Sequence, residues 1–118
     1  MALACGLAVV TAAAIPALGA NTVKVKSKIT IKGVAPRLHG RVKSAKADCV
    51  RRRKVELWQR RFRTGQWRKL GTDKTNHYGK WKIKGGDPHR LYIQRAKVLR
   101  SKVHSEGKTL ICKSDKAY

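Results

Sequence analysis

The sequence predicts a single all-β domain, a sandwich or a barrel, that follows an apolar leader. Three observations predict this fold. Apolar and charged residues alternate along several stretches, turn-forming residues recur roughly every eight to twelve positions, and no stretch after the leader keeps a helical period. A chain of 118 residues is long enough for one such domain and too short for two independent cores.

The leader, Met1–Ala20, contains no charged residue and is rich in Ala, Val and Leu. Pro16 lies just before small residues near its end, which is typical of a secretory signal peptide. We expect cleavage after Gly19 or Ala20, which leaves residues 21–118 as a secreted domain, extracellular or associated with the cell envelope. An uncleaved membrane anchor and a buried segment stay as alternatives, because no Lys or Arg precedes the apolar run.

Residues 22–32 give the clearest strand. One face holds the β-branched residues Val23, Val25, Ile29 and Ile31. The opposite face includes four lysines: Lys24, Lys26, Lys28 and Lys32. Residues 38–44 form the second strand, with Leu38 and Val42 in phase.

The third strand, residues 54–61, has Val55 and Leu57 on one face and Glu56 and Trp58 on the other. Residues 67–75 give a weaker fourth strand.

A turn at residues 76–79 leads into the fifth strand, residues 80–84, where Trp81 and Ile83 point inward. Residues 91–98 form a sixth strand whose inward face the pattern does not assign, and residues 108–113 form the last.

Two cysteines, Cys49 and Cys112, stay in the chain after removal of the leader, which contains Cys5. Two cysteines in an exported domain predict one disulfide, worth roughly 4 kcal/mol for so long a loop, with two free thiols as the alternative. No Cys-x-x-Cys and no pair of His residues at ligand spacing occurs, so we expect no metal and no cofactor.

Four segments resemble the transthyretin-like and carboxypeptidase-regulatory-like β-sandwich domains: Leu38-His-Gly-Arg-Val42, Val55-Glu-Leu57, Thr75-Asn-His-Tyr-Gly-Lys-Trp-Lys-Ile83 and Leu91-Tyr-Ile93. The resemblance implies a Greek-key sandwich of about seven strands, of the prealbumin or immunoglobulin-like kind, that serves support, adhesion or binding and has no catalytic residues. Asn76 stands where these domains usually have Asp, and it can make the same side-chain bond in the turn. The cysteine pair and the basic surface are similar to a secreted, disulfide-bearing subset without a defined role.

The charge is strongly one-sided, with 29 Lys and Arg against six Asp and Glu, for a formal net charge of +23. If the strands at 54–61 and 67–75 pair as a hairpin, three basic clusters meet at its two ends. Such runs are typical of patches that bind anionic polymers, and a solvated charged face is the alternative. The residues of this predicted site are Arg51, Arg52, Arg53, Lys54, Arg60, Arg61, Arg63, Arg68 and Lys69.

Trp58 is out of phase with Val55 and Leu57. It therefore either stands exposed, where it can stack on a sugar or a base, or packs under Arg side chains. Trp81 is expected in the core.

The function that these features favour is a secreted, non-catalytic module that adheres to an anionic polymer or surface: a cell-envelope polymer, an acidic polysaccharide, an anionic lipid surface or nucleic acid. One alternative is a small cationic secreted ribonuclease or toxin, whose catalytic set would come from His39, His77, His89, His104 and Glu56. A second is an intracellular nucleic-acid-binding protein.

Overall fold

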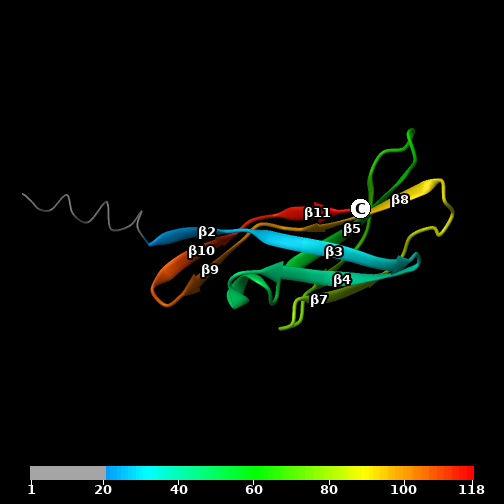
Figure 1. Ribbon diagram of the computed structural model, residues 1–118. Helices are drawn as coiled ribbons and strands as arrows, with labels where there is room; N and C mark the ends of the chain where they lie inside the picture. The colour runs from blue at the N-terminus through cyan, green and yellow to red at the C-terminus, as the bar shows by residue number, and fades with distance from the viewer. Residues whose placement is uncertain (1–20) are drawn as a thin grey trace, which may run out of the picture.

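The computed structural model describes residues 21–118, which form a β-sandwich with a small third sheet at one end (Figure 1). The expected signal peptide lies outside the described residues. Within the described part no helix is long and apolar enough to cross a membrane. The elements are β2 (Thr22–Val25), β3 (Ser27–Val34), β4 (Arg37–Ser44), the 3-10 helix η3 (Ala47–Cys49), β5 (Lys54–Arg61), β6 (Arg68–Lys74), β7 (Lys80–Lys84), β8 (Tyr92–Val98), β9 (Ser101–Ser105), β10 (Lys108–Cys112) and β11 (Asp115–Ala117).

The sandwich has a three-stranded sheet of order β3-β4-β7 and a four-stranded sheet of order β11-β8-β5-β6. All pairs within these two sheets are antiparallel. The chain crosses between the sheets after β4, β6 and β7, so that the non-consecutive pairs β4/β7 and β5/β8 lie side by side. These crossovers make a Greek-key arrangement and confirm the predicted all-β sandwich.

Alternation along the strands builds the core between the two sheets. The three-stranded sheet contributes residues such as Leu38 and Val42, and the four-stranded sheet contributes Val55 and Leu57, all at most 4% exposed. Trp81 is 2% exposed in the same cluster, as predicted. Burial of each such aliphatic side chain stabilises the fold by about 1.5–3 kcal/mol. The outward positions of both sheets are thereby left free to carry charge.

The prediction of one strand over residues 22–32 is wrong. The chain leaves one sheet at Lys26 and enters another, so that β2 pairs in parallel with β10 while β3 pairs with β4. The period of two continues through the crossover, because alternation reports which side of a strand is buried and not which sheet contains it. β9 and β11 are strands that the sequence analysis did not predict, and β11 supplies the seventh strand of the sandwich in place of residues 108–113.

The third sheet, of order β2-β10-β9, is held by the predicted disulfide between Cys49 and Cys112. Their Cα atoms lie 5.4 Å apart, and both residues are fully buried with Val25 and Leu110 in a second, smaller core. The bond therefore connects η3, which lies between β4 and β5, to β10, the central strand of the third sheet.

Two aspartates join the edges of the sandwich. The Asp73 carboxylate on β6 accepts a hydrogen bond from the backbone N–H of Lys82 on β7, at 2.9 Å. On the other side, the Asp115 carboxylate on β11 accepts one from the N–H of Ile29 on β3, also at 2.9 Å. In both cases one sheet's edge strand is bonded to the edge strand of the other sheet.

Candidate polyanion-binding surface

The positive charge of the described residues is almost unpaired. All 29 Lys and Arg lie in residues 21–118, yet only two ion pairs occur there, Arg51 with Asp48 and Lys69 with Glu56. Asp73 and Asp115 bind backbone N–H groups, and Asp87 bonds the backbone of its own turn. Acidic side chains therefore stabilise the fold more than they neutralise its surface.

The predicted hairpin forms, since β5 pairs antiparallel with β6. One end carries Arg60, Arg61, Arg63, Arg68 and Lys69, and the other end carries Arg51, Arg52 and Lys54. The eight residues of β5 place these ends roughly 25 Å apart. The predicted site is therefore two separate clusters.

Arg53 is the exception, because its side chain is buried, with the residue 1% exposed. Its guanidinium donates to four neutral oxygens, at 2.7–3.0 Å: Ser27 Oγ and the carbonyls of Cys49, Leu99 and Lys113. Desolvation lowers the pKa of this guanidinium. The sequence analysis placed Arg53 in the basic surface, but the structure places it under that surface, at the junction of the third sheet and the sandwich.

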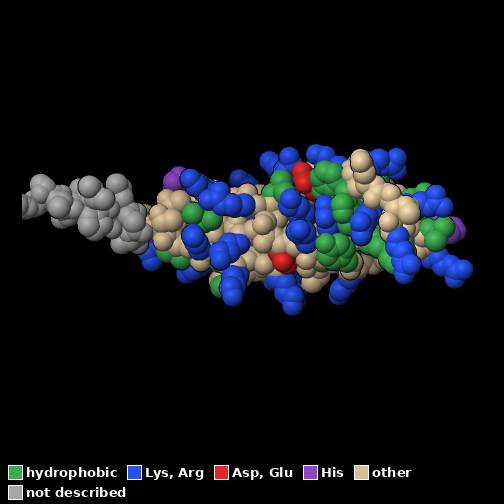
Figure 2. Space-filling view, turned by 90° about the horizontal axis from the view of Figure 1, so that it is seen from above, with side chains coloured by type: hydrophobic (Ala, Val, Ile, Leu, Met, Phe, Trp, Pro, Cys, Tyr) green, Lys and Arg blue, Asp and Glu red, His purple; other side chains and the backbone are tan. Residues whose placement is uncertain are grey.

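A different group of residues stands on the outer face of the four-stranded sheet. Because Val55 and Leu57 point inward, Trp58 and Arg60 point outward, and the register places Arg95 of β8 directly opposite Trp58. A β-bulge between Leu57 and Trp58 brings Lys69 opposite Trp58 on the other side. Figure 2 shows one side of the molecule seen from above, where hydrophobic side chains gather among many Lys and Arg and few acidic side chains.

We call this group the tryptophan face. Its members are Trp58, Arg60, Trp67, Lys69, Arg95 and Tyr118. The guanidinium carbons of Arg95 and Arg60 lie 4.1 Å and 4.9 Å from the ring centroid of Trp67. The ring of Tyr118 lies 6.2 Å from that of Trp67. Such distances are those of cation–π and tilted aromatic contacts, which hold the two guanidinium groups in place.

Trp58 is half-buried and contacts two of these cations. Arg95 Cζ lies 6.0 Å and Lys69 Nζ lies 5.9 Å from its ring centroid. Its indole N–H donates to Glu56 at 3.2 Å, and Lys69 lies 3.6 Å from the same carboxylate. Trp58 is thus on the outer face and also packs against basic side chains, which combines the two alternatives that the sequence left open.

The arginines of the tryptophan face lack polar partners in the described part of the chain. The Nε atoms of Arg60 and Arg95 are shielded from solvent without a hydrogen-bond partner, and no carboxylate pairs with either guanidinium. A buried donor without an acceptor costs free energy, about 1–3 kcal/mol. The Nη groups of Arg60 and Arg95 are not among the buried atoms and form no hydrogen bond or ion pair in the described residues, so they are the donors that an approaching anion could meet.

The sequence analysis missed Arg95, Trp67 and Tyr118. Burial of Ala96 and Val98 places Arg95 on the outward side of β8, whose inward face the sequence pattern did not assign. The contact of Trp67 with Tyr118 joins the β5–β6 hairpin to the last residue of the chain, and no local pattern indicates it.

The histidines do not gather into the set that the ribonuclease alternative requires. His39 is on β4 and Glu56 is on β5, on the outward sides of opposite sheets. His77 lies in the β6–β7 turn and contacts Tyr78, His89 lies before β8, and His104 is on β9 beside Thr109. Within residues 21–118 no three His, Cys, Asp or Glu side chains form a cluster suited to a metal ion.

Comparison of the chain with models of protein families, with curated proteins and with solved structures finds no match. The resemblance to transthyretin-like domains therefore stays a prediction that rests on the four sequence segments.

Proposed function

We propose that this protein is a secreted, non-catalytic module that adheres to an anionic polymer, and that the tryptophan face is its principal contact. The observation that carries the proposal is the arrangement of Arg60 and Arg95 on Trp67, with no carboxylate paired to either guanidinium in the described residues.

Binding would take place in two stages. The net charge of +23 attracts a polyanion over long range and yields affinity through the release of its counter-ions. At close range, each guanidinium can bond a phosphate, sulfate or carboxylate group through two donors at once. Because Trp67 already holds both guanidinium groups, little side-chain entropy is lost on binding.

A matched pair of variants tests this proposal. The first is Arg60→Gln with Arg95→Gln, which removes two charges from the tryptophan face. The control is Arg90→Gln with Arg100→Gln, which removes two charges from exposed positions elsewhere. Affinity for a short DNA duplex and for a sulfated polysaccharide is measured against salt concentration, where each neutralised phosphate of the duplex contributes about −0.9 to the logarithmic slope.

We expect the face variant to lose roughly tenfold or more in affinity for a bound polymer, since each charged hydrogen bond is worth about 1.5–3 kcal/mol. The control should lose only the smaller part of the affinity that depends on net charge. Equal losses in the two variants would mean that charge alone matters and would contradict a localised site. Absence of binding to every polyanion tested would contradict the function itself.

A further inference from the structure

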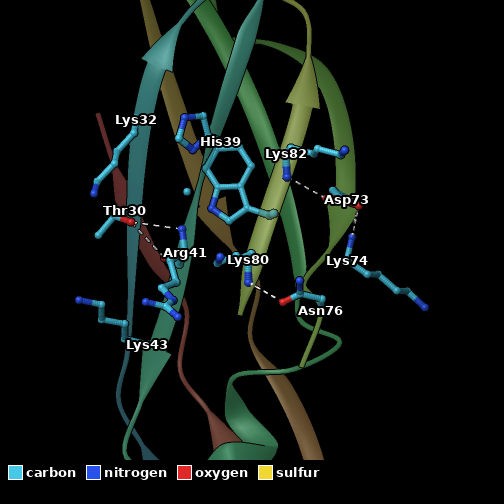
Figure 3. Close-up of a pocket in the computed structure, with 12 residues that line it drawn as sticks. Thr30, Lys32, His39, Arg41, Lys43, Asp73, Lys74, Asn76, Lys80 and Lys82 are labelled. Carbon is cyan, nitrogen blue, oxygen red and sulfur yellow. Dashed lines mark hydrogen bonds between the residues drawn. The ribbon is translucent and has the colours of Figure 1, made fainter. Parts of the chain in front are cut away.

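The outer face of the other sheet, β3-β4-β7, has a groove of about 670 Å³ (Figure 3). Six basic residues line it, and we call it the lysine groove: Lys32, Arg41, Lys43, Lys74, Lys80 and Lys82. Gly40, in the middle of β4, lines the groove beside the buried Trp81. A Cβ atom at position 40 would lie 1.8 Å from the Thr30 carbonyl oxygen, so only glycine fits there.

The strand register arranges the cations across the sheet. Lys32, His39 and Lys82 are direct neighbours on β3, β4 and β7, and Thr30, Arg41 and Lys80 form the next such row. Adjacent strands are about 4.8 Å apart. Arg41 and Lys80 are therefore like charges directly opposite each other, and such a pair repels and destabilises the sheet unless an anion lies beside it, whereas β4 separates Lys32 from Lys82.

Asp73 is the acidic residue that lines the groove, and its carboxylate is already engaged. Its Oδ1 accepts from the backbone N–H of Lys74 and its Oδ2 from that of Lys82, each at 2.9 Å (Figure 3). No ion pair forms between Asp73 and a groove cation in the described part of the chain. The groove therefore presents six basic side chains against one carboxylate, and none of the six forms an ion pair with it.

We propose that the lysine groove is a second anion-binding site, and that one protein molecule bridges two polymer molecules of a linear polyanion. The groove and the tryptophan face are on the outward sides of the two sheets, which pack about 10 Å apart in sandwiches and face away from each other. A polymer molecule bound on one face leaves the other face free to bind a second polymer molecule. This inference rests on the proposed function for the first face and adds cross-linking to adhesion.

A two-step capture assay tests the bridge. The protein is bound to a DNA duplex fixed on a surface, the excess is washed away, and a second, fluorescent duplex is added. The groove variant is Lys43→Gln with Lys80→Gln and Lys82→Gln. The control, Lys102→Gln with Lys108→Gln and Lys113→Gln, removes the same charge from exposed positions in and next to the third sheet. Circular dichroism and thermal unfolding check that both variants fold.

We expect the groove variant to bind the fixed duplex but to capture about tenfold less of the second duplex, while the control captures nearly as much as the unmodified protein. A sulfated polysaccharide in place of DNA tells whether the groove takes sulfate as well as phosphate. Loss of second capture with either polymer supports the site. Full second capture by the groove variant with both polymers would overturn it. If the unmodified protein does not bind the fixed polymer at all, the proposed function fails first, and the two failures are thereby distinguished.

Discussion

The guanidinium of Arg53 donates a hydrogen bond to the carbonyl oxygen of Cys49, at 2.7 Å, in a buried site where each of its acceptors is a neutral oxygen. Two of these acceptors, the carbonyls of Leu99 and Lys113, flank the β9–β10 hairpin of the third sheet along the chain. One positive side chain thereby bonds η3, both ends of the β9–β10 hairpin and the start of β3.

Replacement of Arg53 by Met should destabilise the protein by about 3 kcal/mol or more, because several buried oxygens lose their donor. Arg53→Lys should recover only part of this loss, since an ammonium group cannot reach all four oxygens in a planar arrangement. The control Arg52→Met changes an exposed neighbour and should stay within about 0.5 kcal/mol of the unmodified protein. Urea unfolding measures the free energy of unfolding of the three variants and of the unmodified protein. An Arg53→Met protein as stable as the control would show that the buried hydrogen bonds of Arg53 do not contribute to stability.

The disulfide gives a second prediction. Cys49→Ala with Cys112→Ala should lower the free energy of unfolding by about 2–4 kcal/mol. Because the bond holds the smaller core, hydrogen exchange should increase first in β2, β9 and β10 and later in the sandwich. The mass of the non-reduced protein should be lower than that of the reduced protein by two hydrogen atoms. Two titratable thiols in the native protein would exclude the bond.

Asp48 should make stability depend on pH in the acid range. The Ser105 hydroxyl and then the Arg51 guanidinium lower its pKa, because they bond the charged form. A carboxyl whose folded pKa is lowered stabilises the protein above its unfolded pKa, and that contribution is lost as the pH falls through the folded pKa. The unmodified protein should therefore exceed Asp48→Asn in stability at neutral pH, and the difference should vanish in acid. A difference that persists in acid would point to another cause. The Asp48 side chain is still 23% exposed and its partner Arg51 is more so, and solvent screening therefore keeps the effect small.

The two basic surfaces of β5 and of residues 24–28 should contribute unequally to polyanion binding. Arg60→Ala with Arg61→Ala and Arg63→Ala should weaken binding more than Lys24→Ala with Lys26→Ala and Lys28→Ala, although each triple removes three charges. Arg60 and Arg63 stack on Trp67 and Phe62, whereas the three lysines are exposed around β2 and the start of β3. Titration calorimetry with one polyanion compares the triples. Equal losses would indicate a diffuse adhesive coat.

Much of the fold could be predicted because alternation reports burial directly. Val55, Leu57, Trp81 and Ile83 are buried where the period of two placed them. The turn at residues 76–79 also agrees, since Asn76 accepts from the backbone N–H groups of Tyr78 and Lys80. These features depend on neighbours that are close in the sequence.

The features that could not be predicted depend on distant parts of the chain. Arg53 shares the phase of Val55 and Leu57, so the period indicated its burial, but the run of basic residues around it favoured an exposed position. β11 has three residues, and its pairing with β8 joins segments far apart in the sequence. The tryptophan face depends on that pairing, because β11 brings Tyr118 to Trp67.

The carboxylates of Asp73 and Asp115 also bear on self-association. An edge strand with free N–H groups is a template for strand addition by another molecule, which is a common start of aggregation. Each aspartate occupies one such donor, on Lys82 and on Ile29, and so blocks that position within the molecule. A protein that gathers on a polyanion reaches high local concentration while its own charge repulsion is screened. Under those conditions edge protection by two internal carboxylates would keep crowded molecules folded and separate.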